Sequence, residues 1–157
     1  MIENVFALVR GWVLDELKAL LPGLPAEVLA RVEVTPTKDA AHGDMASNAA
    51  MVAAKPAGKK PGEIAAAMAQ RLAVRLEIAA AEPAGPGFLN LRLEAGFLLR
   101  QLPVILAAGE AYGQGTDKGR VNVVYVSAIP TGPLHVGHCR GAVVGDAIAN
   151  LLGKAGY

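Results

Sequence analysis

Apolar residues recur at helical spacing through the first part of the chain. Between residues 5 and 20 they return every three or four positions, with one polar interruption at Glu16. Pro22-Gly23 follows at once, so the pattern predicts a helix that stops there. Residues 32–35 (Val-Glu-Val-Thr) then predict a short strand that ends at Pro36.

Two further helices are predicted in alanine-rich sequence. Asp44 resembles an N-cap for a helix over residues 45–55. Proline is favoured in a first helical turn, so Pro61 predicts the start of a second helix that runs to about Leu76. Its apolar face carries Ile64, Met68 and Leu72, and Arg71 and Arg75 share a different stripe.

The clearest alternation of apolar and polar residues follows the turn Gly85-Pro86-Gly87. Over residues 88–94 every second side chain is leucine, which predicts a strand with one face against a core. Leu89, Leu91 and Leu93 belong to the core face, and Phe88, Asn90, Arg92 and Glu94 belong to the other. A helix over residues 95–108 should come next, bent or split at Pro103.

A different pattern begins after a glycine-rich polar stretch over residues 109–120, which we take as a domain boundary. Residues 121–126 are almost all apolar and β-branched, which is typical of a strand buried on both faces in a parallel sheet. A loop with proline and glycine leads into a helix over about residues 138–153. Strand, glycine-containing loop and helix together form the opening unit of a doubly wound nucleotide-binding fold.

Composition narrows the possible functions. The chain has 157 residues, 53% apolar residues and a net charge of +1. A chain this neutral has no global field for a polyanion, so any nucleic-acid contact must come from locally placed side chains. No apolar run is long enough for a bilayer, and the N-terminus lacks the basic region of a signal peptide. A single cysteine, Cys139, permits no internal disulfide, so we expect the protein in a reducing cytoplasm and away from membranes.

The loop over residues 127–138 carries the candidate chemistry. His138-Cys139 stands where a Walker A loop needs lysine and a hydroxyl residue, and the dinucleotide glycine fingerprint is absent. What remains is His135 and His138, with Gly137 between them, at a predicted helix N-terminus, where N–H groups and the helix dipole favour phosphate. A glycine there would let a base or ribose lie against the backbone. On spacing alone, histidines that merely cap a helix are equally compatible, and a metal site with Cys139 lacks a fourth ligand.

The polar face of residues 88–94 offers a second candidate. Phe88 could stack on a base, Asn90 could bond to its edge, and Arg92 could meet a phosphate. The alternative is that a helix covers this face and Phe88 is ordinary core, and the pattern alone favours that alternative.

Longer stretches of the chain resemble a known family. Residues 135–138 (His-Val-Gly-His) resemble the HIGH signature of class I aminoacyl-tRNA synthetases, and residues 126–147 are similar to the bacterial arginyl enzymes. Residues 42–50 and 85–93 resemble the additional N-terminal domain of the same arginyl-tRNA synthetases. The resemblance implies an α+β N-terminal domain at residues 1–110, a linker at 111–120, and at 121–157 the first βα unit of a Rossmann-like α/β catalytic domain.

The resemblance also implies an activity and its partners. It implies an arginine–tRNA ligase that uses ATP and Mg²⁺ to activate arginine and passes it to tRNA(Arg). The catalytic residues would be His135 and His138, which with Gly137 also bind ATP. Ser127 and Ile129 would lie at the amino-acid site. The contacts to the D-loop corner of the tRNA would be made by Phe88, Asn90 and Arg92.

Several features depart from that family or stay open. The family usually has a carboxylate where this chain has Val124 and an asparagine where it has Ile129, and both help to hold arginine. The further sheet strands, a KMSKS-type loop and the anticodon domain lie outside the 157 residues, so we expect no aminoacylation by this chain alone. The alternatives are a non-catalytic tRNA-binding module with a relic ATP site, or a truncated product that self-associates through its incomplete sheet.

Two polar clusters in the N-terminal region have weaker assignments. The cluster Lys55, Lys59 and Lys60 is either a phosphate-contacting edge or a solvated loop. Residues 42–44 (His-Gly-Asp) predict a turn with a helix cap and no catalytic role.

Overall fold

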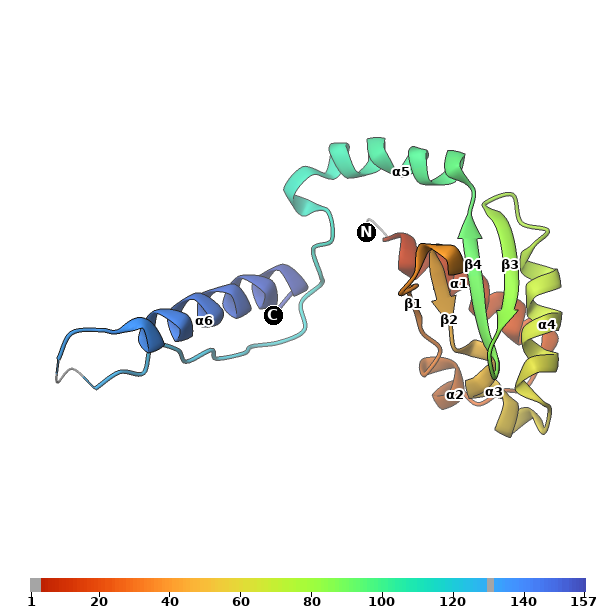
Figure 1. The fold of residues 1–157 in the computed structure, drawn as a ribbon, viewed down its shortest axis with the longest axis horizontal. Coiled ribbons are helices and arrows are strands. Elements are labelled where there is room, and N and C mark those ends of the chain that lie inside the picture. Colours follow the sequence, from red (N-terminus) through yellow and green to blue (C-terminus); the bar gives the residue numbers. More distant parts are fainter. Residues whose placement is uncertain (1–3, 130–131) are drawn as a thin grey trace. The chain divides into compact units, whose positions relative to one another are not determined.

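The chain divides between Ala107 and Ala108 into two compact units. A computed structural model describes residues 4–129 and 132–157 (Figure 1). The first unit is a mixed helix and sheet domain, and the second is built around one long helix. Among the described residues, no helix combines the length and the apolar character that a bilayer crossing requires.

A four-stranded antiparallel sheet organises the first unit. Its strands are β1 (Val34–Pro36), β2 (Met45–Ser47), β3 (Ile78–Ala84) and β4 (Phe88–Leu93), in the order β1-β2-β4-β3. The strand β4 therefore lies inside the sheet and pairs with β2 on one side and with β3 on the other (Figure 1). The predicted turn at residues 85–87 joins β3 to β4 and is confirmed.

The helices that pack against this sheet are α1 (Val5–Leu20), α3 (Ala49–Ala57) and α4 (Pro61–Leu72). The short helix α2 (Ala26–Ala30) packs against α3, and a helical turn η1 (Ala40–His42) precedes β2. The largest fully buried side chains of α1, α4 and β4 form one cluster: Val9, Val13, Leu17, Ile64, Met68, Leu72, Leu89 and Leu91.

The alternation of β4 is confirmed. Leu89, Leu91 and Leu93 are at most 4% exposed, whereas Phe88 is 40% exposed and Arg92 is exposed. The side of the sheet that carries Phe88 is called the open face below. The alternative, that a helix buries Phe88 in the core, is wrong for the described residues.

The predicted start of the helix over residues 45–55, with Asp44 as its cap, was wrong, whereas the rest of that helix is present as α3. Residues 45–47 form β2 between β1 and β4, and α3 begins only at Ala49. The Asp44 carboxylate instead accepts a hydrogen bond from the Leu93 N–H at 2.7 Å. Buried side chains at Met45 and Ser47 stabilise a strand here, and this packing outweighs the helix propensity of the neighbouring alanines.

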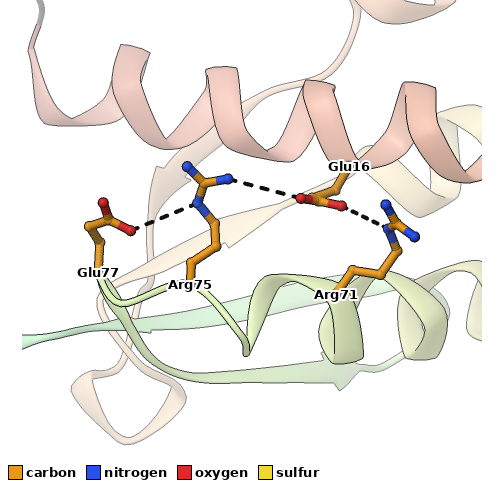
Figure 2. Close-up of polar contacts among 4 residues, drawn as sticks. All are labelled: Glu16, Arg71, Arg75 and Glu77. Atoms are coloured by element: carbon orange, nitrogen blue, oxygen red, sulfur yellow. Dashed lines mark hydrogen bonds and ion pairs between the residues drawn. The ribbon is translucent and has the colours of Figure 1, made fainter.

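Figure 2 shows the pairing of the two arginines that the sequence put on one stripe. The Arg71 Nε lies 2.7 Å from a Glu16 carboxylate oxygen, and an Arg75 NH1 lies 3.9 Å from the other. The helix α4 ends at Leu72, shorter than predicted, and Arg75 lies in the turn that leads to β3. Partly exposed pairs contribute less than about 1 kcal/mol each, so they orient α1 and α4 more than they stabilise them.

The helix α5 (Ala95–Ala108) begins near Trp12 and Arg75. Its Phe97 packs edge-on against Trp12, with ring centroids 5.4 Å apart, and the Arg75 guanidinium lies 4.9 Å from the Trp12 ring. Pro103 lies inside α5 without splitting it.

The second unit contains η2 (Gly109–Ala111) and α6 (Val136–Ala155), which begins two residues earlier than predicted. The predicted strand over residues 121–126 was wrong, because within the described part of the chain no second strand pairs with it. A parallel strand is stable only with neighbours on its edges and helices on its faces. Instead the Tyr125 ring lies against the backbone of Gly145, where a Cβ would come within 2.3 Å of it.

The glycine-rich segment before residue 121 contacts the end of α6. Gly115 N–H donates to the Lys154 carbonyl at 2.8 Å, and Lys118 N–H donates to the Gly156 carbonyl at 2.6 Å. These bonds hold the segment in the second unit. The domain bounds given above stay a prediction.

Candidate nucleic-acid interface and phosphate loop

Pairing across the sheet defines what surrounds Phe88. On the open face Asn90 stands directly opposite Ala46 of β2 on one side and Glu82 of β3 on the other. Phe88 itself stands opposite Ala84. Ala84 is small, and the Phe88 ring is 40% exposed.

A hollow of about 490 Å³ lies over this ring. Its lining includes Phe88, Asn90 and Ala46 from the sheet, with Lys38 and His42 from the connection between β1 and β2. We call it the Phe88 hollow. Its volume is comparable to that of small-molecule pockets.

A smaller hollow of about 80 Å³ adjoins it and is lined by His42, Glu82, Asn90 and Arg92 among others. We call it the Glu82 hollow. An Arg92 NH2 lies 3.4 Å from the Ala40 carbonyl and 3.5 Å from that of Ala41, which are long bonds. The structure thus brings together the three predicted tRNA contacts, with Arg92 leaning toward η1.

Sequence reasoning missed several polar and charged residues around Phe88. Lys38 and His42 line the Phe88 hollow, and Arg31 and Glu33 line a further hollow of about 420 Å³ that Phe88 also borders. No local signal marks them, because they reach Phe88 only through the pairing of β1 with β2. The predicted lysine edge is exposed but lines none of these three hollows: Lys55, Lys59 and Lys60.

The segment at residues 42–44 forms the predicted turn. Gly43 has φ +93°, and a Cβ there would lie 2.7 Å from the Leu91 carbonyl oxygen. The Asp44 N–H donates to that same oxygen at 2.8 Å. The close approach of two backbones therefore requires glycine, and the segment seats η1 beside the open face.

In the second unit, the two candidate histidines cap α6 reciprocally. The His135 Nδ1 accepts a hydrogen bond from the Gly137 N–H, and the His138 Nδ1 accepts one from the His135 N–H, both at 3.1 Å. The ring centroids are 3.9 Å apart. An imidazole nitrogen that accepts carries no proton, so each neutral ring carries its hydrogen on Nε2 and can donate it outward.

This cap leaves fewer free amides than the sequence suggested. The Gly137 N–H is bonded to the His135 ring, and the His138 N–H donates to the His135 carbonyl at 2.9 Å. An anion at this helix start would therefore meet the imidazole Nε2–H groups before most of the bare backbone.

Gly137 also has a more immediate role than the one predicted from sequence. A Cβ at Gly137 would come within 2.9 Å of the His135 Cε1, so the missing side chain makes room for the ring that caps the helix. Nothing in this geometry tests whether a base or ribose lies against Gly137, and that assignment stays a prediction.

The other candidate residues in and around the loop are exposed. Val124 is 73% and Ile129 78% exposed, and Ser127 and Cys139 are exposed too. Pro130 and Thr131, which belong to the predicted phosphate loop, lie outside the described residues.

The tautomer of both histidines is directly measurable. At a pH where the rings are neutral, long-range ¹H–¹⁵N correlation spectra should show His135 and His138 in the Nε2–H form. Gly137→Ala should displace the His135 ring and return His135 to a mixture of tautomers. Gly141→Ala is the matched control, since a Cβ at Gly141 of the same helix meets nothing within 4 Å. Finding Nδ1–H on either ring of the parent protein would contradict the reciprocal cap.

Residues 10–93, more than half of the chain, match the family described as the arginyl tRNA synthetase N terminal domain. The chain belongs to this family. The matched residues of this arginyl-tRNA synthetase N-terminal domain lie within the first unit and include the whole of β4. The α+β fold of the first unit agrees with that membership.

Curated relatives of this arginyl-tRNA synthetase segment match nearly the whole chain. The arginine–tRNA ligase of Gluconobacter oxydans (strain 621H) is 58% identical over 156 residues, which are 98% of the chain and 26% of the relative. The arginine–tRNA ligase of Ruegeria pomeroyi is 56% identical over 163 residues, with 98% and 27% covered. The chain thus spans about a quarter of the length of the curated relatives it matches.

Solved structures of the same family share the fold. A Thermus thermophilus arginyl-tRNA synthetase superposes with a TM-score of 0.63 at 29% identity, over 98% of this chain and 24% of that one. A Plasmodium falciparum arginyl-tRNA synthetase gives a TM-score of 0.69 at 15% identity, over 98% and 29%, and supports the fold alone.

Proposed function

We propose that this chain provides the tRNA-contacting domain and the first part of the ATP site of an arginine–tRNA ligase, and that its 157 residues alone bind tRNA(Arg) without activating arginine. The observation that carries the proposal is the half-exposed Phe88 on an open sheet face, beside Asn90 and two alanines. The names of the relatives support the ligase as the whole protein's activity.

The open face suits an unstacked base. An aromatic ring with one clear side stacks on any base, and an amide beside it can donate to and accept from the base edge. Lys38, His42 and Arg92 lie around the two hollows, within reach of a phosphate backbone that enters them. Local cations such as Lys38 and Arg92 can hold RNA although the net charge is only +1.

The α6 histidines fit the phosphate side of the proposal. Two adjacent imidazoles whose Nδ1 atoms accept backbone bonds each direct an Nε2–H donor away from the helix. Such donors strengthen their bonds to phosphate oxygens as charge develops during displacement at the α-phosphate of ATP. The polar side chains that the loop could offer to a metal ion are imidazoles and hydroxyls. The carboxylate of Asp146 in α6 accepts a hydrogen bond from Asn150. Among the described residues of this loop there is no set of carboxylates that fits Mg²⁺.

The residues at the candidate amino-acid site do not suit the binding of arginine. A guanidinium has five donors and needs a carboxylate fork, and Val124 and Ile129 can accept nothing. Ser127 is the remaining polar side chain among the candidate amino-acid contacts. This favours the second candidate function, a tRNA-binding module with a relic ATP site. Either function belongs in the cytoplasm, where we place the protein.

Two assays on the purified 157-residue chain test the proposal. We expect labelled tRNA(Arg) to bind, with an affinity that falls as salt rises because phosphate contacts release counterions. We expect no arginine-dependent exchange between ATP and pyrophosphate. Exchange above background would overturn the claim that the chain alone is inactive.

Size-exclusion chromatography tests the third hypothesis, that the chain is a truncated product that self-associates. The apolar side chains Val143, Val144, Ile148 and Leu151 are each at least 44% exposed on α6, which leaves room for self-association. A monomer that binds tRNA(Arg) supports the proposal. Large oligomers that bind no tRNA would replace it with the truncated, self-associating product.

A further inference from the structure

Glu82, like Glu33, is an exposed anion near Phe88, where we propose that RNA binds. It is exposed on β3, and within residues 4–129 and 132–157 the ion pairs involve only Glu16 and Glu77 among the acids. An unpaired carboxylate repels RNA phosphates and weakens binding unless it makes a contact that offsets the repulsion.

The position of Glu82 indicates what that contact is. In the register of β3 and β4 it stands directly opposite Asn90, and side chains so placed have Cβ atoms about 4.5–5.5 Å apart. Asn90 lines both the Phe88 hollow and the Glu82 hollow. A base stacked on Phe88 in the larger hollow would therefore extend its edge over Asn90 toward the carboxylate in the smaller one.

The chemistry of the pair discriminates between bases. A carboxylate only accepts hydrogen bonds, whereas the amide of Asn90 both donates and accepts. Adenine, cytosine and guanine each carry an exocyclic amino group that donates. Uracil offers a single N–H between two carbonyl oxygens, and both oxygens repel a carboxylate.

We propose that Glu82 is a specificity-determining residue that, together with Asn90, selects an unpaired base with an exocyclic amino group over uracil. This inference rests on the proposed function, in which Phe88 stacks on such a base. It assigns to Glu82 a direct contact with the RNA that its charge alone would not suggest.

The test begins by finding the base. Transcripts of tRNA(Arg) with single abasic sites through the D-loop are titrated with the parent 157-residue chain and with Phe88→Ala. The base in question is the one whose removal weakens binding to the parent but not to Phe88→Ala. Transcripts with A, C, G or U at that position are then compared.

The parent chain should bind the uracil transcript about tenfold more weakly than the best of the other three, because a bond to a charged group is lost. Glu82→Ala should reduce the difference to less than about twofold. Glu82→Gln keeps the size of the side chain and gains a donor for a uracil oxygen, so it should also bind the uracil transcript relatively better.

Glu33→Ala is the matched control. Glu33 is another exposed carboxylate, and it lines the hollow of about 420 Å³ that Phe88 borders but Asn90 does not. Its removal should raise affinity for all transcripts alike and leave the base preference unchanged, since only repulsion is removed.

The outcomes separate the two proposals. If Glu82→Ala raises affinity for all four transcripts equally, as Glu33→Ala does, Glu82 is only a repulsive charge and the inference is overturned while the stacking site stands. If no abasic site distinguishes the parent from Phe88→Ala, no base stacks there and both proposals fail.

Discussion

Gly43→Ala should destabilise the first unit by roughly 3 kcal/mol, from positive-φ strain and a steric clash together. Gly43 has φ +93°, and an added Cβ would meet the Leu91 carbonyl oxygen at 2.7 Å. That oxygen accepts the Asp44 N–H where β2 begins, so relief of the clash would separate β2 from β4.

Gly23→Ala is the matched control for this prediction. Gly23 has the same φ of +93°, but a Cβ there meets nothing within 4 Å. It should lose only about 1 kcal/mol for the unfavourable backbone conformation. Urea unfolding followed by the fluorescence of Trp12, the only tryptophan and a member of the first unit, measures both variants. Equal losses at the two glycines would show that the approach to Leu91 is not tight.

The sequence predicts best where one period governs the whole element. In β4 the alternation from Phe88 to Leu93 gave both faces correctly, because a strand has no other way to bury three leucines. The helix α1 was predicted to its last residue, since its apolar stripe ends where Pro22-Gly23 begins.

The errors arose where tertiary pairing decides the conformation. Asp44 has the chemistry of a helix cap, but its carboxylate serves the backbone of β4, which is almost fifty residues away in sequence. Residues 121–126 have the composition of a buried parallel strand, yet strand formation requires partners, and the described residues supply none. The local sequence pattern thus limits the secondary structures that a segment can form, and pairing with other segments decides which of them it adopts.

The residues of the candidate site likewise fall into those that the sequence pattern predicted and those that it did not. Phe88, Asn90 and Arg92 were accessible to sequence reasoning because they alternate on one strand. Lys38 and Glu82 were not accessible in this way. Lys38 lies in the connection between β1 and β2, and Glu82 lies on β3, so each comes near Phe88 only when the strands pair. The role of Gly137 in seating the His135 ring also required coordinates, since it depends on the rotamer of a neighbouring side chain.

Phe88→Ala should weaken binding of tRNA(Arg) by roughly 5- to 150-fold, which corresponds to the loss of about 1–3 kcal/mol for one stacked base. The ring is 40% exposed, stands opposite Ala84 and is not part of the core cluster, so its removal leaves that cluster intact. Fluorescence anisotropy with labelled tRNA at one fixed salt concentration measures the change, and Trp12 fluorescence checks that the variant is folded.

Two further variants separate stacking from a general loss of apolar surface. Phe88→Tyr keeps the ring and should bind within about threefold of the parent chain. Phe6→Ala removes another phenylalanine, 37% exposed, from α1 rather than from β4, and should leave tRNA affinity unchanged. If Phe6→Ala and Phe88→Ala weaken binding equally, RNA recognition does not depend on the open face. A folded Phe88→Ala chain with unchanged affinity would show that no base stacks on Phe88.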